Sequence, residues 1–148
     1  MILLDLNIVV DVMLRREPHL AASERMINRI ANGRLAAAVS ADSVSTLYYL
    51  VRKYRDADIA RQAVDWVINH FEIAPVGAQE IKRAQGFDWN DFEDAVIAAA
   101  AESAGCTAIV TRNARDFVRS PVPAMAPEEL VISEIHESLV QGYAAKST

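Results

Sequence analysis

A chain of 148 residues, 52% of them hydrophobic, is long enough for one domain with a hydrophobic core and short for two. Its net charge of -5 argues against a protein that grips nucleic acid through bulk charge, although a metal ion and a few arginines can still hold a substrate locally. The single cysteine, Cys106, excludes an internal disulfide, and the longest apolar run, residues 95–101, is too short to span a bilayer. We therefore expect one cytoplasmic domain over residues 1–148 that does not associate with membranes.

Short apolar runs alternate with stripes of apolar side chains at helical spacing. The runs predict buried strands at residues 2–4, 35–39, 71–76 and 107–110, and an edge strand at 122–125. The stripes predict helices around residues 9–14 (with Asn7 as N-cap), 22–32, 47–54, 59–67, 78–86 and 91–104, and one that opens at Pro127. This alternation is typical of an α/β fold, in which helices cover both faces of a parallel sheet. Ligands bind such sheets at the carboxyl ends of the strands.

Three acidic residues lie where that rule points. Asp5 ends the first strand, Asp116 follows the fourth, and Asp94 lies in the first turn of the helix that leads into the fourth strand. Carboxylates gathered at one edge repel each other, and a hard cation such as Mg²⁺, or Mn²⁺, relieves the repulsion. A water bound to the cation can then attack a phosphate. The sequence therefore predicts a metal site made of these three acids.

Each of these acidic segments also has a purely structural interpretation. Asn90 followed by Glu93 matches a capping box, and Asp91 can stabilise a helix dipole. Asn113 followed by Asp116 can form a cap in the same way. For Asp91 we favour the structural interpretation, because an acid near the start of a helix is usually structural.

Basic residues flank the acidic segments at Arg15, Arg16, Arg112, Arg115 and Arg119. They can position phosphates beside a metal ion, and Arg112 and Arg115 are our candidates for that role. The alternative is a solvated surface paired with acidic residues, and the sequence leaves both open.

Other basic and aromatic residues fall in the third predicted helix. We interpret Arg52, Lys53 and Arg55 as solvated surface. Tyr48 and Tyr49 are more typical of a core or an interface than of a platform for stacked bases. The sequence therefore assigns no binding role to this helix.

Four segments, in order and spread over nearly the whole chain, resemble the PIN-domain family. They are residues 2–7 (ILLDLN), 91–100 (DFEDAVIAAA), 106–117 (CTAIVTRNARDF) and 126–130 (APEEL). The resemblance implies a three-layer sandwich in which helices flank a short central parallel sheet. It also implies a metal-dependent endoribonuclease, often the toxin of a VapC-type toxin–antitoxin pair.

The resemblance also assigns roles to single residues. It implies that Asp5, Asp94 and Asp116 are metal-site acids, and that Asn7 orients the first of them. Asn113 is then a neighbouring polar group, and Asp91 an outer acid. The expected cofactor is Mg²⁺ or Mn²⁺, and the expected partners are an RNA substrate, an antitoxin protein and a second copy of the chain in a homodimer.

One position departs from the family pattern. PIN domains carry a Glu in the helix after the second strand, in a pattern like Ser-Ala-x-x-x-x-Glu-Leu-Tyr, and here residues 40–48 (SADSVSTLY) place Thr46 at that position. A neutral hydroxyl binds a divalent cation less well than a carboxylate does. Asp42, one turn earlier, either reaches the site or caps the helix, and we favour the cap. Thr46 thus supports an alternative function, a catalytically weakened PIN-like module that binds RNA or protein.

A lower-ranked alternative is a haloacid-dehalogenase-like phosphatase. That fold also begins with an Asp directly after a strand. It requires a second Asp two residues later, and this chain has Asn7 there.

Overall fold

The computed structural model describes residues 1–146, and within them five strands form one sheet in the order β3-β2-β1-β4-β5. All four pairs of neighbouring strands are parallel. The strands are β1 (Ile2–Leu4), β2 (Ala37–Ser40), β3 (Glu72–Ala74), β4 (Ile109–Val110) and β5 (Ala124–Met125). The helices are α1 (Leu6–Met13), α2 (Leu20–Ala31), α3 (Ala41–Tyr54), α4 (Ala57–His70), α5 (Ala78–Phe87), α6 (Phe92–Ser103), the short 3-10 helix η1 (Ala114–Phe117) and α7 (Pro127–Lys146).

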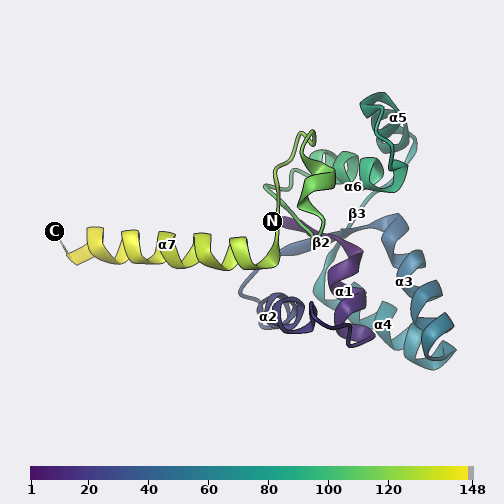
Figure 1. Ribbon diagram of the computed structural model, residues 1–148, viewed down its shortest axis with the longest axis horizontal. Helices are drawn as coiled ribbons and strands as arrows, with labels where there is room; N and C mark the ends of the chain where they lie inside the picture. The colour runs from purple at the N-terminus through teal and green to yellow at the C-terminus, as the bar shows by residue number, and fades with distance from the viewer. Residues whose placement is uncertain (147–148) are drawn as a thin grey trace.

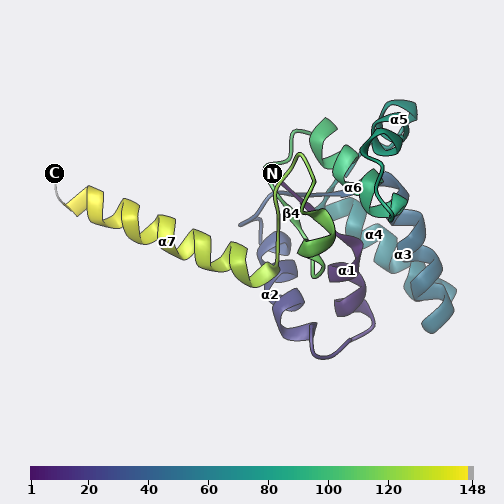
Figure 2. The same cartoon turned by 45° about the horizontal axis from the view of Figure 1, so that its top comes forward.

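Helices cover both faces of the sheet, which confirms the predicted three-layer α/β fold (Figures 1 and 2). Side chains alternate between the two faces along a strand, so neighbours in β1 enter different cores. Leu4 packs with side chains of α1 to α4, whereas Leu3 packs with Ile97 and other side chains of α6. A strand that is buried on both faces must be apolar throughout, and this explains the short continuous apolar runs in the sequence.

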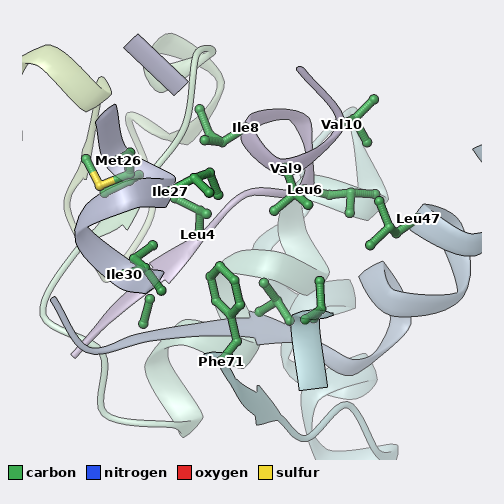
Figure 3. Close-up of a cluster of buried hydrophobic side chains, with 14 of the residues drawn as sticks. Leu4, Leu6, Ile8, Val9, Val10, Met26, Ile27, Ile30, Leu47 and Phe71 are labelled. Carbon is green, nitrogen blue, oxygen red and sulfur yellow. The ribbon is translucent and has the colours of Figure 1, made fainter. Parts of the chain in front are cut away.

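The larger core lies between the sheet and helices α1 to α4 (Figure 3). Met26 and Ile30 from α2 and Phe71 at the end of α4 lie around Leu4 of β1, and Leu47 from α3 belongs to the same core on the side of Leu6. Each is buried, and burial of a side chain of this size contributes about 1.5–3 kcal/mol. The apolar stripes seen in the sequence are thus the faces that the helices turn toward the sheet.

In two helices the N-cap lies two residues before the residue that the sequence analysis predicted for it. Asp5, not Asn7, is the N-cap of α1, and Ser40, not Asp42, is the N-cap of α3. In both cases the helix follows the strand without a loop. The extended residue at the junction is therefore itself the N-cap. Asp42 lies inside the first turn of α3.

The caps of the later acidic helices also differ from the predicted capping boxes. The N-cap of α6 is Asp91, whose Oδ1 accepts a hydrogen bond from the backbone N–H of Asp94 at 3.1 Å, so the predicted box that starts at Asn90 is wrong. Asn113 does precede η1, but its side chain makes no capping hydrogen bond. Asp91 therefore has a structural role, as expected.

Helix α7 projects away from the rest of the molecule (Figures 1 and 2). Leu130 near its start is buried in the larger core, whereas Ile132 and Val140 are exposed. Among the described residues, no helix is both long and apolar enough to cross a membrane.

Candidate functional site

Seven of the residues singled out in the sequence line one cavity of about 300 Å³. It lies where β1 and β4, which are neighbours in the sheet, end beside the first turn of α6. Its lining residues are Asp5, Leu6, Asn7, Val10, Arg16, Thr46, Leu50, Asp91, Glu93, Asp94, Ile97 and Asn113. Four other candidates do not line it: Asp42, Arg112, Arg115 and Asp116.

Asp5 is buried, and its carboxylate is held from two sides. Thr111 Oγ1 donates a hydrogen bond to Oδ2 at 2.7 Å, and Asn7 Nδ2 donates to the same oxygen at 3.0 Å. Burial raises the pKa of Asp5 above its usual value, while the hydrogen bonds from Thr111 and Asn7 and the charge of Arg112 act in the opposite direction. Its hydrogen-bonding side-chain partners, Thr111 and Asn7, are neutral donors, which fix its orientation but place no positive charge in contact with it.

The pKa of Asp94 is strongly perturbed. Partial burial raises the pKa of Asp94 to about 7, with further contributions from the negative charges of Asp91, Asp5, Asp116 and Glu93. Near neutral pH this carboxyl group is therefore close to its midpoint of protonation. A cation in the cavity would displace the proton and relieve the repulsion.

Glu93 is a cavity residue that the sequence analysis treated only as a partner in a cap. Burial raises the pKa of Glu93, and so do the charges of Asp91, Asp42 and Asp5. Asp42 therefore acts on the site through its charge, although it does not line the cavity. Thr46 does line the cavity, at the position where the family carries Glu. The signal for Glu93 in the sequence was the run of three acids in four residues at the start of α6.

Asp116 lies in η1, exposed, at the margin of this site. It does not line the cavity, but its charge is close enough to raise the pKa of Asp94. The preceding loop is fixed by Thr111 Oγ1, which accepts a hydrogen bond from the backbone N–H of Asn113 at 3.1 Å. Arg115 in the same short helix is exposed.

Arg112, one of the two candidates for phosphate binding, contacts an acid that the sequence analysis did not single out. Its Nε lies 3.3 Å from Oδ2 of Asp11, a fully buried residue of α1, and Ser23 Oγ donates to the same oxygen at 3.3 Å. A buried carboxylate is costly unless it is paired, so this contact stabilises the fold around Arg112. An acid among the apolar residues of α1 was the available signal for Asp11.

Arg16 reaches the cavity because of the way α1 ends. The backbone N–H of Arg16 donates to the carbonyl of Asp11 at 2.9 Å, and that of Arg15 donates to the carbonyl of Val12 at 3.3 Å. Arg15 has a φ of 51°, the left-handed conformation that closes a helix with this pair of bonds. The chain thus folds back over the end of α1 and brings Arg16 to the wall of the cavity.

The donor set of the cavity suits a hard divalent cation. Its polar groups are mainly carboxylate, amide and hydroxyl oxygens, which are the ligands that Mg²⁺ and Mn²⁺ take. Asn7 Oδ1 is buried there with no hydrogen-bond partner among the described residues. Within residues 1–146, no three His, Cys, Asp or Glu side chains are gathered tightly enough to form a ready metal cluster. The acids are thus neighbours that a cation would draw closer.

Comparison with known proteins finds a matching family model and a related ribonuclease. The model of the PIN domain family matches residues 1–115. Ribonuclease VapC1 of Aquifex aeolicus (strain VF5) is 26% identical over 133 residues, which are 86% of this chain and 91% of that protein.

Solved structures share the fold. A toxin–antitoxin complex from Klebsiella pneumoniae aligns with a TM-score of 0.66 and 21% identity, covering 86% of this chain and 98% of that chain. VapBC2 from Rickettsia felis, bound to a DNA fragment from its promoter, aligns with a TM-score of 0.63 and 21% identity, covering 85% of this chain and 98% of that one.

Proposed function

This chain belongs to the PIN domain family, and we propose that it is a divalent-metal-dependent endoribonuclease that acts as the toxin of a toxin–antitoxin pair. The observation that carries the proposal is the electrostatics of the cavity. Partial burial and four neighbouring acids raise the pKa of Asp94 to about 7, in a pocket that also holds Asp5 and Glu93. Excess negative charge of this kind, in a cleft lined by oxygen donors, is suited to a cation that binds phosphate.

We assign the metal-binding role to Asp5, Asp94 and Asp116, with Glu93 as an additional acid. Mg²⁺ or Mn²⁺ bound there would supply a Lewis acid and an acidified water for attack on a phosphodiester. Asn7 and Thr111 orient the Asp5 carboxylate through their hydrogen bonds.

Two arginines are left for the substrate. Arg16, which lines the cavity, can bind a phosphate oxygen beside the acids, and Arg115 can do so from the exposed margin. Arg112 is less suited to this task, because its side chain is only 23% exposed and is paired with Asp11. Arg16 and Arg115 would thus let a chain of net negative charge bind RNA locally.

The competing function is a catalytically weakened module that binds RNA or protein, and Thr46 favours it. Thr46 lies in the cavity but contributes no negative charge there. Glu93 contributes a carboxylate to the same cavity, which supports the nuclease proposal. The family assignment leaves the phosphatase alternative without support.

The proposed partners are an RNA substrate, an antitoxin and a second copy of the chain, in the cytoplasm. The antitoxin is supported by the relatives of known structure that were solved as toxin–antitoxin complexes. The buried Cys106 fits a reducing compartment.

The test is cleavage of a mixed RNA pool by the purified chain. We expect cleavage with Mg²⁺ or Mn²⁺, none with EDTA, and none by the folded Asp94→Asn variant. Cleavage that persists in EDTA would contradict the metal-dependent mechanism. No cleavage by the wild type with either metal would favour the binding module.

A further inference from the structure

A half-exposed tyrosine flanked by two cations lies beside the acidic cavity. Tyr54, the last residue of α3, is 55% exposed. The guanidinium carbon of Arg16 lies 5.9 Å from the centre of its ring, and the Nζ of Lys53 lies 5.4 Å from it. Arg16 also lines the cavity, so this single side chain joins the acidic site to the aromatic ring.

The same face of α3 runs from the cavity to this ring. Thr46 and Leu50 line the cavity, and Tyr54 follows at the same spacing of four residues, so all three lie on one stripe of the helix. From Thr46 to Tyr54 the helix rises about 12 Å, so a strand whose backbone reaches the cavity can extend along this stripe to the ring. Helices α1 and α3 pack against each other, and Arg16, which follows α1, contacts the Tyr54 ring and lines the cavity.

The composition of this surface matches the chemistry of single-stranded nucleic acid. Proteins hold such strands with aromatic rings that stack on the bases and with cations that bind the phosphates. Tyr54 supplies an exposed ring, while Arg16 and Lys53 supply the charges next to it. A peptide partner has no phosphates to match these cations, and paired bases in a duplex present no free face to the ring.

We propose that Tyr54, Arg16 and Lys53 form a subsite that binds one nucleotide of single-stranded RNA beside the acidic cavity. Its base stacks on Tyr54, and the adjoining phosphates contact Arg16 and Lys53. The subsite rests on the proposed function, because it holds the strand whose backbone reaches the acids. It also gives α3 a role in substrate binding. The sequence analysis had assigned no such role to the basic residues of this helix.

The test measures binding separately from cleavage. Fluorescence anisotropy would follow a labelled single-stranded RNA of mixed sequence in Mg²⁺, with Asp94→Asn in every protein so that the RNA stays intact. Loss of one stacked base corresponds to a roughly 5- to 100-fold weaker affinity, so we expect that loss for Tyr54→Ala and much less for Tyr54→Phe. Arg16→Gln and Lys53→Gln should also weaken binding, and each should reduce its dependence on salt.

Tyr49→Ala is the matched control. Tyr49 lies on the same helix and is 64% exposed, but it is about 140° around the axis from Tyr54. Binding by Tyr49→Ala should match that of the parent, and a duplex RNA competitor should not displace the strand. The subsite is overturned if Tyr54→Ala binds as tightly as the parent, if Tyr49→Ala loses as much affinity, or if the parent does not bind RNA.

Cleavage by proteins with Asp94 restored separates this proposal from the nuclease itself. Metal-dependent cleavage together with unchanged binding by Tyr54→Ala would overturn the subsite and leave the nuclease standing. Tyr54-dependent binding without cleavage by the wild type would support the subsite and favour the RNA-binding module over the nuclease.

Discussion

Two buried aspartates at the two ends of α1 contact opposite kinds of partner. Asp5, the N-cap, accepts hydrogen bonds from the neutral side chains of Thr111 and Asn7. Asp11, near the other end, lies against the guanidinium of Arg112. Consecutive residues of the loop after β4 thus contact one acid each, Thr111 contacting Asp5 and Arg112 contacting Asp11. A buried acid in contact with a cation is compensated within the fold, whereas one held by neutral donors has no counter-charge in contact with it, and a bound metal can supply one.

The largest expected effect comes from breaking the compensated pair. Arg112→Ala leaves the fully buried Asp11 without its cation, and we expect the free energy of unfolding to fall by about 3 kcal/mol. Urea denaturation followed by circular dichroism would measure it. The double variant Asp11→Leu with Arg112→Met should recover most of the loss, because it removes both charges.

Asp5→Asn is the matched control at the other end of the helix. It keeps the shape of the side chain and removes a charge that burial disfavours, so without metal it should cost less than about 1 kcal/mol or even stabilise the protein. A loss as large as that of Arg112→Ala would show that the two aspartates do not differ as described.

The second prediction concerns the carboxylate of Asp94, to which we assign a role in metal binding. Asp94→Asn keeps the shape of the side chain and removes a carboxylate from the cavity, so affinity for Mn²⁺ should fall about tenfold or more, with the fold intact. Calorimetric titration with Mn²⁺ would measure the affinity. An unchanged affinity would remove Asp94 from the site, and Asp88→Asn, which does not line the cavity, serves as the control.

The third prediction follows from the protonation of Asp94. Its pKa of about 7 in the folded protein exceeds the 3.8 of an ordinary Asp, so between these values the folded state binds more protons than the unfolded state. Stability without metal should therefore fall as the pH rises from about 4 to about 7, and then level off. Because Asp94 is partly exposed, we expect a loss of about 1–2 kcal/mol. Urea denaturation across this range would show the slope, which should shrink in Asp94→Asn and with Mn²⁺.

The smallest predicted effect comes from adding a carboxylate at Thr46. Thr46→Glu adds a carboxylate to the cavity, so the apo protein should melt lower and Mn²⁺ should stabilise it more. A tenfold gain in affinity adds about 1.4 kcal/mol, or a further shift of about 3–6 °C in melting temperature. Melting and RNA cleavage with and without Mn²⁺ would be compared with Thr46→Gln, which adds no charge. If Glu and Gln behave alike, the side chain at this position does not act on the metal.

Local patterns in the sequence determined most of the fold. Strand alternation and helical stripes depend on neighbouring residues, so all five strands and the three-layer arrangement followed from them. The same rule located Asp5 and Asp94 at the edge where β1 and β4 end, because parallel strands bring their carboxyl ends together. The resemblance to the PIN domain family was also legible in the motifs, and the family match over residues 1–115 confirms it.

Only the tertiary structure decided how the charges are compensated. Asp11 meets Arg112, and Tyr54 meets Arg16, across separations in sequence that no local pattern encodes. The pKa of Asp94 likewise depends on burial and on charges brought in from other segments. The energy of a charge in a protein is set by every group and solvent molecule around it, so it is fixed only when the chain has folded.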